Sequence, residues 1–211
     1  MEILLCSLIG YFIGSVNPAY ILSKLRGFDI RNRGSGNAGA SNTVIIMGKK
    51  AGFLVAVFDI CKAIIAAEIG AYLFSQFKFS KILAGSSCII GHIYPIFMKF
   101  HGGKGLACLG GLILSFNPRL FSLLLLAEIV LAFSIDYICV VPITGSLIFT
   151  SCYAFLTGDA VGTLILSIVT LVIVYKHIEN IYRIRNGTEA HISFLWKKEQ
   201  ELERIRKNEH T

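Results

Sequence analysis

Charged residues are scarce in this chain: aspartate, glutamate, lysine and arginine make up 16% of its 211 residues. Soluble domains usually contain about 25% charged and about 45–50% apolar residues. Here 55% of the residues are hydrophobic, and the mean hydropathy is +0.68. This shortage of charge excludes an ordinary soluble domain and indicates an integral membrane protein.

The positive charge is unevenly spread, although the formal net charge is +7. Most lysines and arginines lie at residues 24–50, 99–104 and 176–207, next to apolar runs. The C-terminal stretch WKKEQELERIRKNEH mixes both signs, unlike a continuous basic patch for nucleic acid. We therefore expect no nucleic-acid partner and interpret the basic segments as cytoplasmic loops beside membrane spans.

The six cysteines form no C-x-x-C pair, and all of them lie in apolar stretches. This pattern argues against zinc and disulfide frameworks and indicates small buried side chains. The carboxylates are scattered, so we expect no metal site. The N-terminal apolar run lacks the basic n-region of a signal peptide, and we expect it to be a retained span.

A membrane helix needs about 20 mainly apolar residues. About seven runs qualify, near residues 2–23, 51–75, 80–98, 105–116, 120–139, 141–157 and 160–178. The fourth is short and glycine-rich, which is typical of a tilted, internally packed or re-entrant helix. We predict an all-α, polytopic integral membrane protein in which residues 1–211 form one membrane-embedded domain, with a basic cytoplasmic tail at about 181–211.

The distribution of charge also predicts the orientation. With the N-terminus outside, the segments rich in lysine and arginine lie on the cytoplasmic side together with the C-terminus. Lys78, Lys81 and Arg119 then fall in the outside turns.

Asp59 and Lys62 lie three residues apart inside the second predicted span. Residues at that spacing share a helix face and can form an ion pair, and charges at membrane depth usually face protein or water. A structural ion pair and a supporting position beside a polar site both remain open. His92, in the third span, is either a hydrogen-bonded core residue or part of the segment that follows it.

Three polar segments lie at ends of predicted spans. The first, RNRGSGNAGASN (residues 31–42), combines glycines with neutral hydrogen-bond donors. Glycines let backbone N–H groups approach an oxyanion closely, and hydroxyl and amide side chains add donors. A flexible linker is the alternative interpretation.

The second segment, GHIYPIFMKFHGGKG (residues 91–105), places Lys104 among glycines but is not a Walker A loop, because Gly105 stands where serine or threonine is required. The third, HIENIYRIRNGTE (residues 177–189), puts His177, Asn180 and Arg183 on one helix face. A helix that anchors to anionic lipid would explain the arginines but not His177 and Asn180.

Together the segments resemble the motifs of bacterial membrane glycerol-3-phosphate acyltransferases that use an acyl-phosphate donor. The family patterns are G-S-G-N-x-G-A-T-N, G-H-x-x-P-x-F-x-x-F-x-G-G-K-G and H-x-x-N-I-x-R-x-x-x-G-x-E. The matching residues here are Gly34–Asn42, then Gly91, His92, Pro95, Phe97, Phe100 and Gly102–Gly105, then His177, Asn180, Ile181, Arg183, Gly187 and Glu189.

The resemblance implies an enzyme that transfers a fatty acyl group from acyl phosphate to the 1-hydroxyl of sn-glycerol 3-phosphate. The products would be 1-acylglycerol 3-phosphate (lysophosphatidic acid) and phosphate. It implies a seven-span bundle in the bacterial plasma membrane, with the site facing the cytoplasm and no cofactor. We expect the protein to contact membrane lipid and to be monomeric.

The resemblance also implies which residues act. The catalytic set is Ser35, Lys104, His177 and Asn180. The substrate-binding set is Gly34, Gly36, Asn37, Gly39, Ser41, Asn42, His92, Gly102, Gly103, Gly105, Arg183 and Glu189. Either His177 or a phosphate oxygen of a substrate is the candidate general base. The histidine–aspartate dyad H-x-x-x-x-D of other acyltransferases is missing from the sequence.

Two positions depart from the family pattern. Ser41 stands where the family has threonine, and it keeps the hydroxyl group. The family commonly has an arginine three residues after the asparagine of the first motif, and here that residue is Ile45. Isoleucine cannot replace the two-pronged phosphate contact of a guanidinium. Arg31, Arg33, Lys49 and Lys50 are the candidates to compensate.

Two other classes of function remain. A membrane transporter for a phosphorylated small solute would also need a basic polar site, but near the bilayer midplane. A small partner of a larger complex would not need three such segments.

Overall fold

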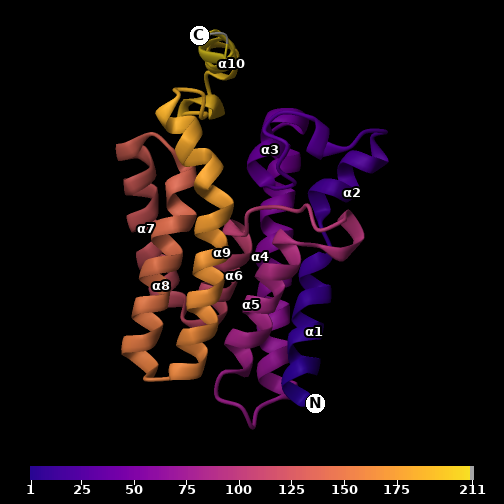
Figure 1. Ribbon diagram of the computed structural model, residues 1–211, viewed down its shortest axis with the longest axis vertical. Coiled ribbons are helices and arrows are strands. Elements are labelled where there is room, and N and C mark those ends of the chain that lie inside the picture. Colours follow the sequence, from indigo (N-terminus) through magenta and orange to yellow (C-terminus); the bar gives the residue numbers. More distant parts are fainter. Residues whose placement is uncertain (210–211) are drawn as a thin grey trace.

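The computed structural model describes residues 1–209, and helices form the regular structure of that part. The α-helices are α1 (Glu2–Ser15), α2 (Pro18–Leu25), α3 (Ala40–Met47), α4 (Lys49–Leu73), α5 (Ser80–Ile93), α6 (Leu106–Phe116), α7 (Pro118–Ile135), α8 (Val141–Thr157), α9 (Ala160–Arg185) and α10 (Lys198–Glu209). Short 3-10 helices are η1 (Ile30–Asn32), η2 (Ile96–Met98), η3 (Ile138–Val140) and η4 (Ile192–Leu195). The N-terminus and α10 lie at opposite ends of the long axis (Figure 1).

Helices occupy every predicted span position, but fewer stretches are long and apolar enough to cross a membrane. By length and composition these are Glu2–Leu25, Ser80–Met98, Pro118–Ile135, Ile138–Thr157 and Ala160–Arg185. α4 has 25 residues but carries several charges, and α6 has only 11 residues. The chain is an all-helical integral membrane protein with about five candidate spans, compared with the about seven that the sequence predicted.

α5 packs closely along α1 because glycines line the contact. A Cβ atom added at Gly10 would lie 2.2 Å from the carbonyl oxygen of Ala84, and one at Gly14 would lie 2.0 Å from that of Cys88. Gly10 and Gly14 form the small-xxx-small spacing that allows membrane helices to approach. Because lipid provides little hydrophobic drive between helices, this close van der Waals contact stabilises the pair.

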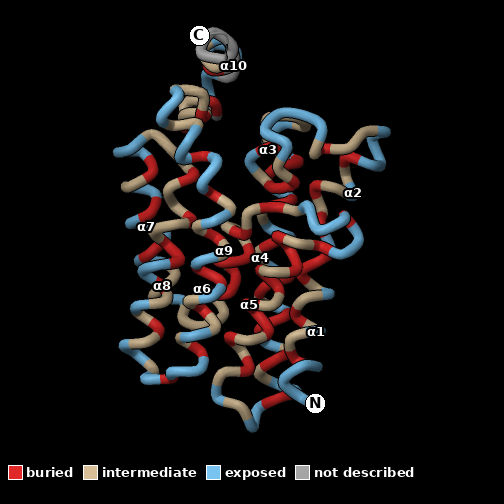
Figure 2. The backbone as a smooth tube through the Cα atoms, viewed as in Figure 1, coloured by how far each residue is buried: buried red, intermediate tan, exposed pale blue. Residues whose placement is uncertain are grey.

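The buried residues concentrate in α4, α5, α6 and the facing side of α9, whereas α7 and α8 expose much of their surface (Figure 2). Of the apolar stretch of the span Pro118–Ile135, only 17% is buried inside the protein, compared with 61% for the span Ser80–Met98. The exposed side chains of α7 and α8 include Leu126 and Phe155, which suits contact with lipid tails.

A sharp turn joins α6 to α7. The Asn117 side-chain oxygen accepts hydrogen bonds from the N–H groups of Arg119 (3.0 Å) and Leu120 (3.1 Å), and Pro118 occupies the first helical position. A side-chain N-cap followed by proline is favoured at the start of a helix, so α7 begins directly after Asn117.

Replacing Gly14 with alanine should disrupt the α1–α5 contact, because the added Cβ atom would overlap a backbone carbonyl that cannot rotate away. We expect the free energy of unfolding in detergent to fall by about 1–3 kcal/mol. Gly110→Ala is the matched control, since its nearest neighbour is a side-chain atom of Phe121 at 3.6 Å. Equal unfolding midpoints for both variants would contradict the close contact.

Candidate functional site

A cavity of about 330 Å³, called the polar cavity below, lies between the loop before α3, the start of α6 and the end of α9. The predicted site residues on its walls are Ser35, Asn37, Gly39, Ser41, His92, Lys104, Gly105, His177, Asn180 and Glu189. The other lining residues are Ala40, Ile45, Ala56, Asp59, Leu106, Ala107, Ile138, Cys139, Pro142, Ala190 and Phe194. The fold therefore brings all three polar segments to one place.

A second depression of about 420 Å³, called the cationic groove, adjoins the polar cavity. The two share Ser35, Asn37 and Lys104. The remaining residues of the groove are Arg31, Asn32, Gly36, Lys99, His101, Gly102, Lys176 and Glu179. Its lysines and arginine give it a positive potential, which attracts anions from water.

Among the described residues, four predicted site residues line neither depression: Gly34, Asn42, Gly103 and Arg183. Asn42 holds the loop together from below. Its side-chain N–H₂ group donates to the carbonyls of Arg33 (2.9 Å) and Asn37 (3.0 Å), and its oxygen accepts from the N–H of Ser35 (3.0 Å). The loop is thus ordered by one buried amide, which is unlike a flexible linker.

Gly102 and Gly103 pack against the end of α5. Their N–H groups donate to the carbonyls of Ile93 (3.1 Å) and His92 (3.0 Å), so these donors are already used. A Cβ atom at Gly102 would lie 2.1 Å from the His92 carbonyl oxygen, and one at Gly103 would lie 2.0 Å from the His92 ring. The glycine pair therefore allows a close backbone approach that positions the following residue, Lys104.

Lys104 is the cation common to both depressions. Its ammonium donates to the side-chain oxygen of Asn180, and the Asn180 N–H₂ group donates to the Glu189 carboxylate at 2.7 Å. Glu189 thereby fixes the orientation of the Asn180 amide, with its oxygen toward Lys104. Burial lowers the pKa of Lys104 below its ordinary range, opposed by the charge of Glu189.

The His177 ring is buried and forms part of the wall of the polar cavity. Nδ1 lies 2.7 Å from the carbonyl oxygen of Ile173, one turn earlier in α9. A carbonyl only accepts hydrogen bonds, so Nδ1 carries the proton and Nε2 of the neutral ring keeps a lone pair. This tautomer is suited to accept a proton from a hydroxyl group.

The N-termini of α3 and α6 also face the polar cavity. The sequence motifs did not predict the contribution of α6. α3 begins after Gly39 and α6 after Gly105, and neither has a side-chain cap. Ala40 and Leu106, in the first turns, line the cavity. Uncapped N–H groups and the positive end of the helix dipole together favour a bound anion. The signal in the sequence was the glycine that precedes each apolar run.

The arginines near the site already have partners within the protein. Arg183 pairs with Glu179, a residue of the cationic groove. Arg31 donates to Asp29 and, at 2.7 Å, to the Met98 carbonyl, and its guanidinium holds the pKa of Asp29 well below its usual range. Arg33 lies over the Phe28 ring, 4.2 Å from its centroid.

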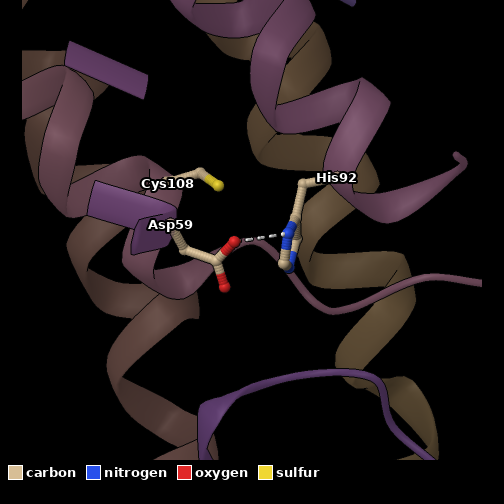
Figure 3. A group of neighbouring side chains, drawn as sticks. All are labelled: Asp59, His92 and Cys108. Atoms are coloured by element: carbon tan, nitrogen blue, oxygen red, sulfur yellow. Dashed lines mark ion pairs between the residues drawn. The ribbon is translucent and has the colours of Figure 1, made fainter. Parts of the chain in front are cut away.

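A buried cluster lies directly beneath the polar cavity. Candidate ligand atoms of Asp59, His92 and Cys108, from α4, α5 and α6, lie within 4.8 Å of one another (Figure 3). The Lys62 ammonium, however, is 2.7 Å from Asp59 Oδ1 and 3.0 Å from His92 Nδ1. The cluster therefore already contains a cation beside two of its three candidate ligands.

Lys62 also connects the cluster to α1. Its ammonium donates to the carbonyls of Gly14 (3.0 Å) and Val16 (2.8 Å), at the C-terminal end of that helix. The ion pair expected from the i, i+3 spacing of Asp59 and Lys62 is confirmed. It is both a structural link between helices and a support beneath the cavity wall at His92.

The chain matches a family model described as glycerol-3-phosphate acyltransferase over residues 4–187. It is 36% identical over 191 residues to the glycerol-3-phosphate acyltransferase of Thermoanaerobacter pseudethanolicus, covering 90% of this chain and 96% of the relative. It is 34% identical over 197 residues to the Bacillus subtilis enzyme of that name, covering 92% and 100%.

Two solved structures have the same fold. One is the crystal structure of PlsY, an integral membrane glycerol 3-phosphate acyltransferase, in its glycerol 3-phosphate form. It superposes with a TM-score of 0.83 at 31% identity, over 92% of this chain and 98% of the other. The lysophosphatidic acid form of PlsY superposes with a TM-score of 0.79 at 30% identity, over 90% and 95%.

Replacing Lys62 with methionine should destabilise the protein strongly, because it leaves the Asp59 carboxylate buried without its cation. We expect a loss of about 3–5 kcal/mol in the free energy of unfolding in detergent. The double variant Lys62→Met with Asp59→Leu removes both charges and should recover most of that loss. An additive double variant would show that the two side chains do not interact.

Proposed function

We propose that this chain takes its acyl group from an acyl phosphate. The chain belongs to the glycerol-3-phosphate acyltransferase family and is an enzyme that forms lysophosphatidic acid. The observation that carries the proposal is the convergence of two uncapped helix N-termini and Lys104 on one cavity. Such a site binds a phosphate strongly, and the apolar walls beside it suit an acyl chain.

In this proposal the donor phosphate lies between the N-termini of α3 and α6, with Lys104 neutralising its charge. Ser35, Asn37 and Ser41 supply further hydrogen bonds from the loop. These donors are fixed before the reaction, because Asn42 orders the loop and Glu189 orients the partner of Lys104. Preorganised donors are most effective where charge develops in the transition state, here on the acyl oxygen and the departing phosphate.

Glycerol 3-phosphate enters through the cationic groove, whose lysines attract its phosphate. Its 1-hydroxyl oxygen attacks the acyl carbon, and the bond from that carbon to the donor phosphate breaks. His177 Nε2 takes the hydroxyl proton and returns it to the released phosphate. The hydrogen bond from Nδ1 to Ile173 supports this role, because it places the ring proton on Nδ1 and leaves the Nε2 lone pair available to accept a proton.

The proposal includes a topology of seven spans formed by one domain, with the N-terminus outside and the site on the cytoplasmic side of a bacterial plasma membrane. α4 and α6 would be the two further spans. The charges inside α4 suit this, because Asp59 and Lys62 neutralise each other within the bundle. Arg31, Lys99 and Lys176 gather at the cavity end, in keeping with the positive-inside rule.

An acyl-transfer assay tests the donor and the cation together. We expect purified protein to form lysophosphatidic acid from palmitoyl phosphate and labelled glycerol 3-phosphate. Lys104→Ala should lower kcat by about 10²–10³, the usual effect of removing one oxyanion donor. Lys78→Ala is the control, because Lys78 is an exposed lysine that contacts Thr157 away from the cavity.

The same assay measures the effect of Ile45, which lines the polar cavity. Ile45→Arg should raise kcat/KM for palmitoyl phosphate by adding a phosphate contact. Product from palmitoyl-CoA alone would contradict the proposed donor. Product only from Ile45→Arg would mean that Lys104 and the helix N-termini do not suffice.

The rate should also depend on alkaline pH through Lys104. Its pKa is lowered by burial, so the ammonium form is present below that pKa and is lost as pH rises through it. We expect kcat/KM to fall at a pH below the ordinary lysine value of about 10.4. Lys104→Arg should shift this fall to higher pH, whereas an unshifted profile would assign the titration to another group.

A further inference from the structure

The segment after Gly187 forms one wall of the polar cavity. Residues 189–194, called the C-terminal strap below, cross the end of the cavity after α9. Glu189, Ala190 and Phe194 of the strap line the cavity. The strap thus contributes one motif residue, Glu189, and one apolar side chain, Phe194, to the wall of the site.

The strap is tied to the turn between α7 and α8. The N–H of Ile192 donates to the Asp136 carbonyl (3.0 Å) and to its side-chain Oδ1 (3.1 Å). The His191 ring nitrogen Nε2 lies 3.0 Å from the Tyr137 hydroxyl. Beyond the strap, the Trp196 ring stacks on Phe133 of α7.

Arg204 of α10 holds the other side of the strap. Its guanidinium donates to the Glu189 carbonyl at 2.6 Å and pairs with Glu201. Glu201 in turn accepts a hydrogen bond from the N–H of His191 at 2.8 Å. Contacts on both sides therefore hold the strap in one position, and with it the side chain that it presents to the cavity.

Phe194 is that side chain, and it is 8% exposed. It shares the apolar wall of the cavity with Ile138, Cys139 and Pro142, from η3 and the start of α8. Glycerol 3-phosphate is polar throughout, so it has no part that matches this wall. The acyl chain of the donor is the apolar part of the two substrates.

We infer that Phe194 contacts the acyl chain and sets which chain lengths the enzyme accepts. The inference rests on the proposed placement of the acyl donor in the polar cavity. At about 330 Å³ the cavity lies near the lower limit of about 300 Å³ for ligand sites, so a long chain fills it and meets Phe194. A smaller side chain at this position leaves room for more methylene groups, and a larger one leaves less.

The test compares Phe194→Ala and Phe194→Trp with the wild type on lauroyl, palmitoyl and stearoyl donors. The donors are given as acyl phosphates and as acyl-CoA, and kcat/KM is measured for each. Each methylene that gains or loses burial changes the rate ratio about fourfold. We expect the stearoyl-to-lauroyl ratio to rise by at least about fourfold in Phe194→Ala and to fall in Phe194→Trp, with KM for glycerol 3-phosphate unchanged.

Phe155→Ala is the control, because Phe155 of α8 is 90% exposed and should leave the ratio unchanged. A uniform loss of rate on all chain lengths in both Phe194 variants, or an unchanged ratio, would overturn the inference. If the wild type were active on acyl-CoA alone, that result would contradict the proposed donor. The stearoyl-to-lauroyl ratio of kcat/KM would then be measured with the acyl-CoA donors, and it would still test the role of Phe194. The two failures are therefore distinguishable.

Discussion

The buried ammonium of Lys62 is the contact on which the arrangement of the site depends. It binds the last carbonyls of α1, the Asp59 carboxylate on its own helix and the His92 ring on α5. Taking a charge out of water costs several kcal/mol, and only a complete set of partners offsets that cost. The three helices are therefore held in one arrangement, in which α1 ends beside α4 and His92 stands at the floor of the polar cavity. The glycine pair that precedes Lys104 packs on that histidine, so the position of Lys104 depends on the position of Lys62.

The positive potential of the cavity comes from fixed backbone N–H groups together with the ammonium group of the Lys104 side chain. The N-termini of α3 and α6 present N–H groups that cannot turn away, because they belong to helices packed into the bundle. Lys104 is long and flexible, but Asn180 and Glu189 restrict it by a hydrogen-bond chain with one allowed direction. An anion in the cavity thus meets donors whose positions are set before it arrives, which is the condition for effective electrostatic stabilisation.

Glycines have three different tasks in this molecule, and their local sequence does not distinguish them. Gly10 and Gly14 let two membrane helices touch, Gly102 and Gly103 let a loop pack on the end of a helix, and Gly105 starts α6 with a positive φ of 91°. The family resemblance places Gly102, Gly103 and Gly105 among the substrate-binding residues. In the structure the N–H groups of Gly102 and Gly103 donate to α5, and the start of α6 provides the free donors instead.

The sequence alone determined the membrane class, the helical composition, the three polar segments and the family, because these depend on local composition and on motif spacing. It also predicted the Asp59–Lys62 pair, since that contact lies within one helix turn. Only the tertiary structure decided which polar groups face the cavity. Asn42, Arg31 and Arg183 are as polar as Asn180 and Lys104, but none of the three lines the polar cavity. The contribution of Phe194 was likewise invisible, because it depends on contacts between residues far apart in the chain, such as Asp136 with Ile192. Hydrogen-bond partners and cavity walls are set by packing, and no local pattern encodes them.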